Sequence, residues 1–257
     1  MVIPIHDKNP TRRTPYVTYL LIALNVAVFL VQPIARTSVS GDVDLAQACR
    51  QEAFFRRYGA VPKELTSNEP AQVVPVGPGP EPNTCVVAAP DYRKRPFVSA
   101  LTSMFLHGGW LHLLGNMLFL FVFGNNVEDR LGRLRFLFAY LAWGVVATYA
   151  FALPNAGSEN VVVGASGAIA GVLGAYLMIF PRAKVLSLVP FFFFLPLRLP
   201  AWLVLGSWFA LQAFYSSGAT ISEGGGVAYL AHVAGFVAGV VSGMAFRGAP
   251  RERAPAW

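Results

Sequence analysis

The sequence predicts an all-α integral membrane protein, a bundle of six transmembrane helices with both termini in the cytoplasm. Of its 257 residues, 55% are hydrophobic and only 13% are charged, whereas a soluble domain usually carries nearly twice that share of charge. Apolar runs recur along the chain at about 20 residues each, the length at which a helix crosses a bilayer.

Lysine and arginine gather in alternate connections between these runs, which sets the direction of the spans. They lie before the first run, between the second and third, between the fourth and fifth, and after the last: Lys8, Arg12, Arg13, Arg130, Arg133, Arg135, Arg182, Lys184, Arg198, Arg247, Arg251 and Arg253. The connections at 154–160 and 216–226 contain neither residue. Cytoplasmic loops carry such an excess, so the net charge of +7 indicates a lipid bilayer rather than nucleic acid as the partner.

The expected membrane domain covers residues 16–246, between a basic cytoplasmic tail at 1–15 and a cytoplasmic tail at 247–257 that looks disordered. We expect its spans at about 16–35, 105–125, 134–153, 161–180, 201–215 and 227–246. A cleavable signal peptide is the alternative for the first run, but the run is long and lacks a small-x-small cleavage site. Residues 189–200 are broken by proline and should connect two spans at the cytoplasmic membrane surface. A turn is expected at 128–132.

Residues 36–96 form a long extracytoplasmic loop in this scheme. The loop is polar and rich in proline, with a cluster of breakers at 75–82, and a short helix is plausible at about 47–58. Both cysteines, Cys49 and Cys85, lie in it. An oxidising exterior would permit a disulfide between them, and two free thiols are the alternative, because a sequence does not give their separation.

Polar side chains within the expected spans are functional candidates, since burying them in lipid is costly. They are Asn25, His112, Asn116, Ser166 and His232, with His107 at a boundary. His112 and Asn116 are four residues apart and share a helix face, so their donors could bind a developing oxyanion or only stabilise helix packing. A zinc site is not favoured, because His107 and His112 are five apart and no acid in the spans completes a ligand set.

Two expected helices carry glycines along one side, and each also carries one of these candidates. Gly167, Gly171 and Gly174 follow Ser166, and Gly235, Gly239 and Gly243 follow His232. Glycine faces allow two helix backbones to approach closely, which would bring Ser166 and His232 within the hydrogen-bond distance that an activated serine requires. Packing without catalysis is the alternative. The serine does not lie in a Gly-x-Ser-x-Gly hydrolase elbow, because residue 168 is alanine.

Taken in order, His112-Leu-Leu-Gly-Asn116, Gly164-Ala-Ser166-Gly167 and Ala231-His232-Val-Ala-Gly235 resemble the rhomboid family of intramembrane serine proteases. The stretches Glu128-Asp-Arg-Leu-Gly132 and Leu21-Ile-Ala-Leu-Asn25 are also similar to that family. The resemblance implies a dyad with Ser166 as nucleophile and His232 as general base. It also implies an oxyanion site of His112, Asn116 and the Ser166 amide, supporting glycines at 164, 167, 235 and 239, and no metal or cofactor.

Two features depart from the pattern of some rhomboid proteins. Position 170 is alanine, where those proteins carry an aromatic residue that stacks on the histidine. The first outer loop also lacks their Trp-Arg pair and holds the long insert instead. The sequence therefore leaves the positioning of His232 and the anchoring at the membrane edge unexplained.

The resemblance implies an endopeptidase that cleaves single-span membrane proteins near the outer face of the bilayer. We expect a bacterial cytoplasmic membrane, because the sequence shows no organelle-targeting presequence. A catalytically inactive relative that binds transmembrane clients is the alternative, although such proteins usually lack the serine or the histidine. A transporter or channel would require charged residues in the spans, and the expected spans contain essentially none.

Overall fold

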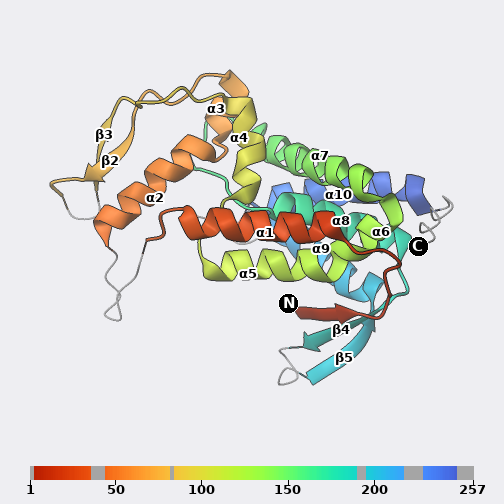
Figure 1. Ribbon diagram of the computed structural model, residues 1–257. Coiled ribbons are helices and arrows are strands. Elements are labelled where there is room, and N and C mark those ends of the chain that lie inside the picture. The colour runs from red at the N-terminus through yellow and green to blue at the C-terminus, as the bar shows by residue number, and fades with distance from the viewer. Residues whose placement is uncertain (1–2, 36–43, 82–83, 190–194, 217–227, 248–257) are drawn as a thin grey trace. The chain divides into compact units, whose positions relative to one another are not determined.

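The structure is a computed structural model, and it describes residues 3–35, 44–81, 84–189, 195–216 and 228–247. Most of these residues are helical (Figure 1). The chain divides into two compact units. The first contains Met1–Ala23, Leu114–Phe151 and Ser166–Trp257, and the second contains Leu24–Leu113 and Ala152–Ala165.

The first unit is built mainly from apolar helices. They are α1 (Tyr16–Val31) and α5 (Trp110–Phe119), each of which belongs to it in part, and α6 (Asn125–Leu131), α7 (Arg133–Ala152), α8 (Ser166–Ile179), α9 (Ala201–Ser216) and α10 (Tyr229–Arg247). A π-helical turn, η2 (Leu120–Gly124), joins α5 to α6. In the described chain, three helical runs are long and apolar enough to cross a membrane: Trp110–Leu131, Arg133–Ala152 and Tyr229–Arg247. The total of six spans and the direction of the termini stay predictions.

A small antiparallel sheet corrects the prediction of an all-α fold. Strand β1 (Ile3–Asp7) pairs with β4 (Lys184–Val189), which pairs with β5 (Leu195–Pro200), in the order β1-β4-β5 (Figure 1). Part of the expected N-terminal tail and part of the expected connection at 189–200 are therefore strands. The prolines of β5 lie on an edge strand, where a missing backbone N–H is tolerated, so they did not exclude a strand.

Two predicted span boundaries were wrong. The second helical run begins at Trp110, after Gly108 and Gly109, and continues to Leu131 through the residues for which a turn was predicted. Gly132 ends it with φ 82°, a left-handed value that suits glycine. The fourth span begins at Ser166 rather than 161, because Val162 pairs with Ala60 in an isolated β-bridge.

The second unit contains most of the predicted loop at 36–96, and much of it is ordered structure. It has α2 (Leu45–Tyr58), α3 (Pro62–Ser67), β2 (Val74–Pro78), β3 (Cys85–Ala88), α4 (Pro96–Thr102) and a 3₁₀ turn, η1 (Ser103–Phe105). Helix α2 confirms the short helix expected there. Prolines expected only to break structure instead lie in β2, which pairs with β3.

Two interactions fix this insert internally. A disulfide joins Cys49 of α2 to Cys85 of β3, with their Cα atoms 5.8 Å apart. The Lys94 ammonium lies 2.5 Å from the Glu64 carboxylate, and both side chains are 4% exposed. Burial lowers the pKa of Lys94, while the hydrogen bond to Glu64 opposes that shift.

The glycine faces of α8 and α10 pack backbone to backbone, as predicted. A Cβ atom added at Gly235 would collide with the carbonyl oxygen of Gly167, and one added at Gly239 would collide with that of Gly171. A Cβ atom at Gly174 would meet the backbone of Phe236 in the same way. Residues 227 and 248–257, which include parts of the expected sixth span and C-terminal tail, lie outside the described residues.

Candidate active site

Ser166 and His232 come together in the first unit. Ser166 is the first residue of α8, and His232 lies in the first turn of α10. The His232 Nε2 atom is 2.8 Å from the Ser166 Oγ atom, a hydrogen-bond distance. His232 is buried and Ser166 is half-buried. The expected approach of the two side chains is thus observed.

The other ring nitrogen of His232 faces a residue that the sequence analysis missed. The His232 Nδ1 atom is 2.7 Å from the Gln212 Oε1 atom of α9, and Gln212 is buried. An amide oxygen only accepts hydrogen bonds, so Nδ1 carries the proton in this arrangement. The neutral ring then presents the lone pair of Nε2 to the Ser166 hydroxyl. Gln212 is a polar side chain within the fifth apolar run, and the rule that selected Asn25 and Asn116 would have found it.

Aromatic neighbours of His232 come from α9 and α10. The Trp208 ring centroid lies 6.0 Å from that of His232 at an interplanar angle of 33°, and the Tyr229 centroid lies 6.4 Å away at 90°. Residue 170, the aromatic position of some relatives, is a buried alanine in α8. Trp208 therefore provides an aromatic surface near His232 that the sequence analysis did not identify.

His112 lies on α5, and a backbone group determines which of its nitrogens can donate. The Gly108 N–H donates to the His112 Nδ1 atom at 3.3 Å. The neutral ring therefore carries its proton on Nε2 and can donate a hydrogen bond from that atom. The neighbouring ring of His107 packs edge-on at 5.1 Å between centroids, and the backbone of His107 is held by the Gln32 side chain.

Asn116 follows His112 by one helical turn on α5, so the two residues share a helix face. Its side chain is 8% exposed. The Asn116 Nδ2 group makes no hydrogen bond to any residue that the structure describes. A buried amide donor without a partner is costly, and a site that receives negative charge from a ligand is one reason to retain it.

Two other glycines of the predicted site, Gly164 and Gly167, flank Ser166 in the sequence. Gly164 has φ 126°, a conformation that side chains rarely adopt, and its N–H donates to the Ser103 carbonyl at 2.9 Å. Gly167 lies close to Ala147 of α7, so that an added Cβ atom would be 2.7 Å from the Ala147 Cβ atom. Since Ser166 begins α8, the first backbone N–H groups of that helix lack intrahelical acceptors.

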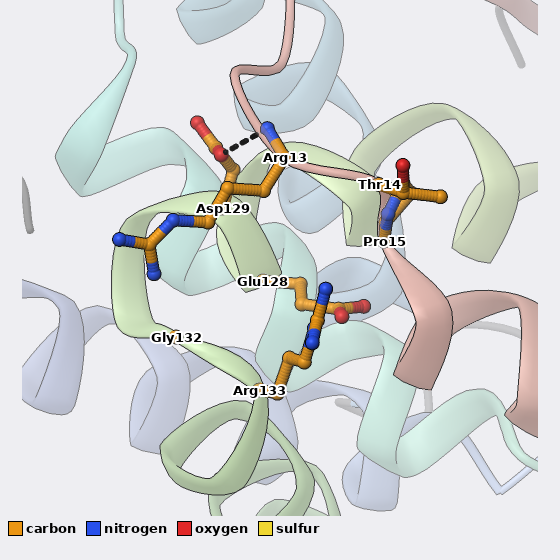
Figure 2. A pocket seen from close by; sticks show the side chains of 7 residues that line it. All are labelled: Arg13, Thr14, Pro15, Glu128, Asp129, Gly132 and Arg133. Carbon is orange, nitrogen blue, oxygen red and sulfur yellow. Dashed lines mark hydrogen bonds between the residues drawn. The ribbon is translucent and has the colours of Figure 1, made fainter. Parts of the chain in front are cut away.

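The stretch Glu128–Gly132 has a structural position away from the dyad. The buried Glu128 carboxylate accepts from the Val17 and Thr18 N–H groups at 3.0 and 2.7 Å and caps the start of α1. Asp129 accepts from the Arg13 N–H group (Figure 2). Arg130 donates to the Phe246 and Arg247 carbonyls at the end of α10.

The small cavity beside this cap, about 10 Å³, is lined by Arg13, Thr14, Pro15, Glu128, Asp129, Gly132 and Arg133 (Figure 2). That volume is about what one water molecule requires. The hydrogen bonds of Glu128 and Arg130 link this segment to the start of α1 and to the end of α10.

Comparison with known proteins identifies the family. Residues 94–249 match the model of the Rhomboid domain, which is more than half of the chain. The chain belongs to the rhomboid family, whose members embed in the bilayer, are generally proteases, and act on membrane proteins.

Individual relatives match over shorter stretches. RHOMBOID-like protein 5 of Arabidopsis thaliana is 39% identical over 77 residues, which is 30% of this chain and 25% of that protein. The mitochondrial Rhomboid protein 1 of Saccharomyces cerevisiae is 31% identical over 150 residues, 57% of this chain and 41% of that protein. A rhomboid protein of Bacillus subtilis is 39% identical over 77 residues, 30% of this chain and 38% of that protein.

The chain thus spans less than half the length of these three curated relatives. They include a mitochondrial protein, a plant protein and a bacterial protein. The similarities therefore support a membrane-embedded protein, but they do not support a bacterial cytoplasmic membrane over the other membranes.

Proposed function

We propose that this rhomboid protein is an intramembrane serine endopeptidase with Ser166 as nucleophile and His232 as general base. The observation that supports the proposal most strongly is the 2.8 Å separation of His232 Nε2 and Ser166 Oγ. A serine hydroxyl is a weak nucleophile until a neighbouring base takes its proton. The tautomer set by Gln212 leaves Nε2 able to do so.

The reaction follows acyl-transfer chemistry. As the Ser166 Oγ atom attacks the peptide carbonyl, the hydroxyl proton moves to His232 Nε2. The tetrahedral intermediate then expels the amine, which takes that proton from His232 as it leaves. In the second half, His232 removes a proton from water, the water oxygen attacks the Ser166 ester, and the proton returns to Ser166 as the acid product leaves.

His112, Asn116 and the Ser166 N–H are the proposed donors to the oxyanion. The Gly108 contact leaves His112 Nε2–H available, and the buried Asn116 amide lacks a partner among the described residues. Preorganised donors of this kind commonly contribute about 10²–10³ in rate each. None of these steps requires a metal or cofactor.

The proposed substrates are single-span membrane proteins, cleaved near the outer face of the bilayer. A peptide bond in a helix is shielded by its own hydrogen bonds, and in lipid those bonds have no replacement. The segment to be cut must therefore unwind where water and Ser166 can reach it, so small or helix-breaking residues should flank the cleaved bond.

The test is cleavage of a tagged single-span substrate in proteoliposomes by wild type, Ser166→Ala and His232→Ala. Ser207→Ala is the matched control, because its hydroxyl donates to the Val204 carbonyl one turn earlier in α9. Both dyad variants should lose cleavage by at least about 10³-fold, while the control retains it. Cleavage by Ser166→Ala would refute the assignment. If wild type is inactive and no fluorophosphonate probe labels Ser166, the chain is instead an inactive relative that binds transmembrane clients.

A further inference from the structure

With alanine at position 170, another part of the chain must position His232. The mechanism requires one tautomer, with the proton on Nδ1 and the lone pair on Nε2. An isolated imidazole adopts either tautomer. Something must therefore hold the ring and its proton in place, as a buried carboxylate does in a Ser-His-Asp triad.

We propose that Gln212 is the positioning residue of His232, which makes the arrangement a Ser166-His232-Gln212 triad. The contact is short, 2.7 Å from Gln212 Oε1 to His232 Nδ1, and both side chains are buried. The Gln212 oxygen accepts a hydrogen bond from Nδ1–H of the neutral His232 ring. It also accepts one from Nδ1–H of the imidazolium that forms when Ser166 loses its proton. The contact thus persists through the proton transfer. This inference rests on the proposed function.

Helix α9 supplies a second contact that supports this role. Trp208 precedes Gln212 by one helical turn, and its ring lies 6.0 Å from that of His232 at 33°. One face of α9 therefore presents an aromatic surface and a hydrogen-bond acceptor to the same imidazole. Together the two residues provide the positioning that the aromatic residue at position 170 provides in some relatives.

The positioning role of Gln212 can be tested with substitutions that keep its shape but change its ability to accept a hydrogen bond. Gln212→Met keeps the length and volume of the side chain but removes the acceptor, whereas Gln212→Glu keeps an acceptor and adds a buried charge. If Gln212 positions His232, kcat should fall about tenfold in Gln212→Met with KM unchanged, because one neutral hydrogen bond is lost. Gln212→Glu should retain more activity than Gln212→Met. If Gln212 only fills space, the order reverses.

The outcomes are distinguishable from failure of the dyad itself. Ser207→Ala on the same helix controls for disturbance of α9, and resistance to SDS unfolding reports whether each variant is folded. Wild-type cleavage that depends on Ser166 and His232 but is unchanged in Gln212→Met would overturn the positioning role alone. Cleavage that is independent of Ser166 would overturn the proposed function.

An independent inference concerns an arginine pocket in the second unit. A cavity of about 320 Å³ is lined by Arg57, Arg93 and Arg95, with Tyr58, Tyr92 and the end of α4 around them. Arg57 lies over the Tyr92 ring at 4.7 Å and the Tyr58 ring at 5.4 Å, which orders its side chain. Within the described chain none of the three arginines forms an ion pair with a carboxylate.

The nearby charges leave the pocket positive. Lys94 also lines it, but its ammonium is used by the Arg56 and Gly59 carbonyls at 2.6 and 2.9 Å and by Glu64. Lys94 therefore supports the pocket rather than a ligand. Among the described residues, one unpaired carboxylate, that of the exposed Asp91, lies near the pocket. It opposes the charge of three arginines that form no ion pair in the described chain.

An apolar surface adjoins this charge. Helix α4 begins directly after Arg95, and its residues Phe97, Val98 and Leu101 are 58, 37 and 38% exposed. A phospholipid presents a phosphate next to acyl chains, and arginine pairs well with phosphate oxygens. We infer that the arginine pocket binds the phosphate of an anionic phospholipid and anchors the insert at the membrane surface.

The test compares phosphatidylglycerol, phosphatidylcholine and inorganic phosphate as additives to the purified full chain in detergent. Phosphatidylglycerol should raise the unfolding temperature more than phosphatidylcholine does. That difference should vanish when Arg57, Arg93 and Arg95 are all changed to Gln, and it should persist in Arg56→Gln, whose arginine pairs with Glu52 outside the pocket. An equal response to both lipids, a response that survives the triple change, or equal stabilisation by phosphate alone would overturn the inference.

Discussion

The two units of the chain are stabilised internally by different means. In the first unit, α8 and α10 approach so closely that Gly235 and Gly239 have no room for a side chain. In the second, the insert is fixed by a disulfide and a buried ion pair. Lipid is as apolar as leucine, so helix association in a membrane depends on close packing, whereas a segment in water can use covalent and ionic links.

Breaking the buried ion pair should have the largest effect. In Lys94→Met the Glu64 carboxylate stays buried, and it keeps the hydrogen bond from the Ala71 N–H. Leaving one charge unpaired in this way usually costs about 4 kcal/mol, which denaturant unfolding of the second unit would show. Adding Glu64→Leu should restore most of the loss. Lys63→Met, which breaks the exposed pair with Glu159, should leave stability unchanged.

Removing the disulfide should have the next largest effect. The bond closes a separation of 36 residues, and a link of that span stabilises by about 3–4 kcal/mol through the unfolded state. Cys49→Ser with Cys85→Ser should therefore unfold the insert at lower denaturant, and reductant should do the same to wild type. A reductant effect of equal size in the double variant would contradict this explanation.

The glycine contact should be sensitive to a single methyl group. Gly239→Ala forces a Cβ atom against the Gly171 backbone, and overpacking of this kind costs about 2 kcal/mol. Separation of α8 from α10 should also move His232 away from Ser166 and lower cleavage. Gly206→Ala is the matched control, because a Cβ atom there meets nothing within 4 Å. Equal stability of the two variants would refute the close-packing account.

The smallest effect concerns a polar contact in the glycine-packed unit. Asp7 of β1 accepts from Tyr176 and Asn126 at 2.6 and 2.8 Å, and burial raises its pKa above 3.8. The folded state therefore binds this proton more tightly than the unfolded state, so the contribution is full at pH below 3.8 and is lost as pH rises through the folded pKa. Asp7→Asn should show a shallower loss of stability from pH 4 to 7 than wild type. Identical slopes would contradict it.

Most helix positions could be predicted from the sequence, because apolar runs mark the helices and glycine spacing indicates which helices pack closely. The approach of Ser166 to His232 followed from two glycine faces. The sheet was missed because its strands are only five or six residues long and because the prolines of β5 indicated a broken connection rather than a strand. Gln212 is a polar residue within the fifth apolar run, so the sequence could have made it a candidate, but its contact with His232 on another helix required the three-dimensional arrangement.

The cap at Glu128 and the position of His232 have a consequence for synthesis of the chain. During synthesis, the start of α1 has no cap until Glu128 is made, more than a hundred residues later. Arg130 also lacks its acceptors until the end of α10 is made. Ser166 likewise precedes its base by 66 residues. In the proposed mechanism, a ribosome-bound chain therefore carries a serine without a base, and the nascent protein stays inert in the membrane until α10 is inserted.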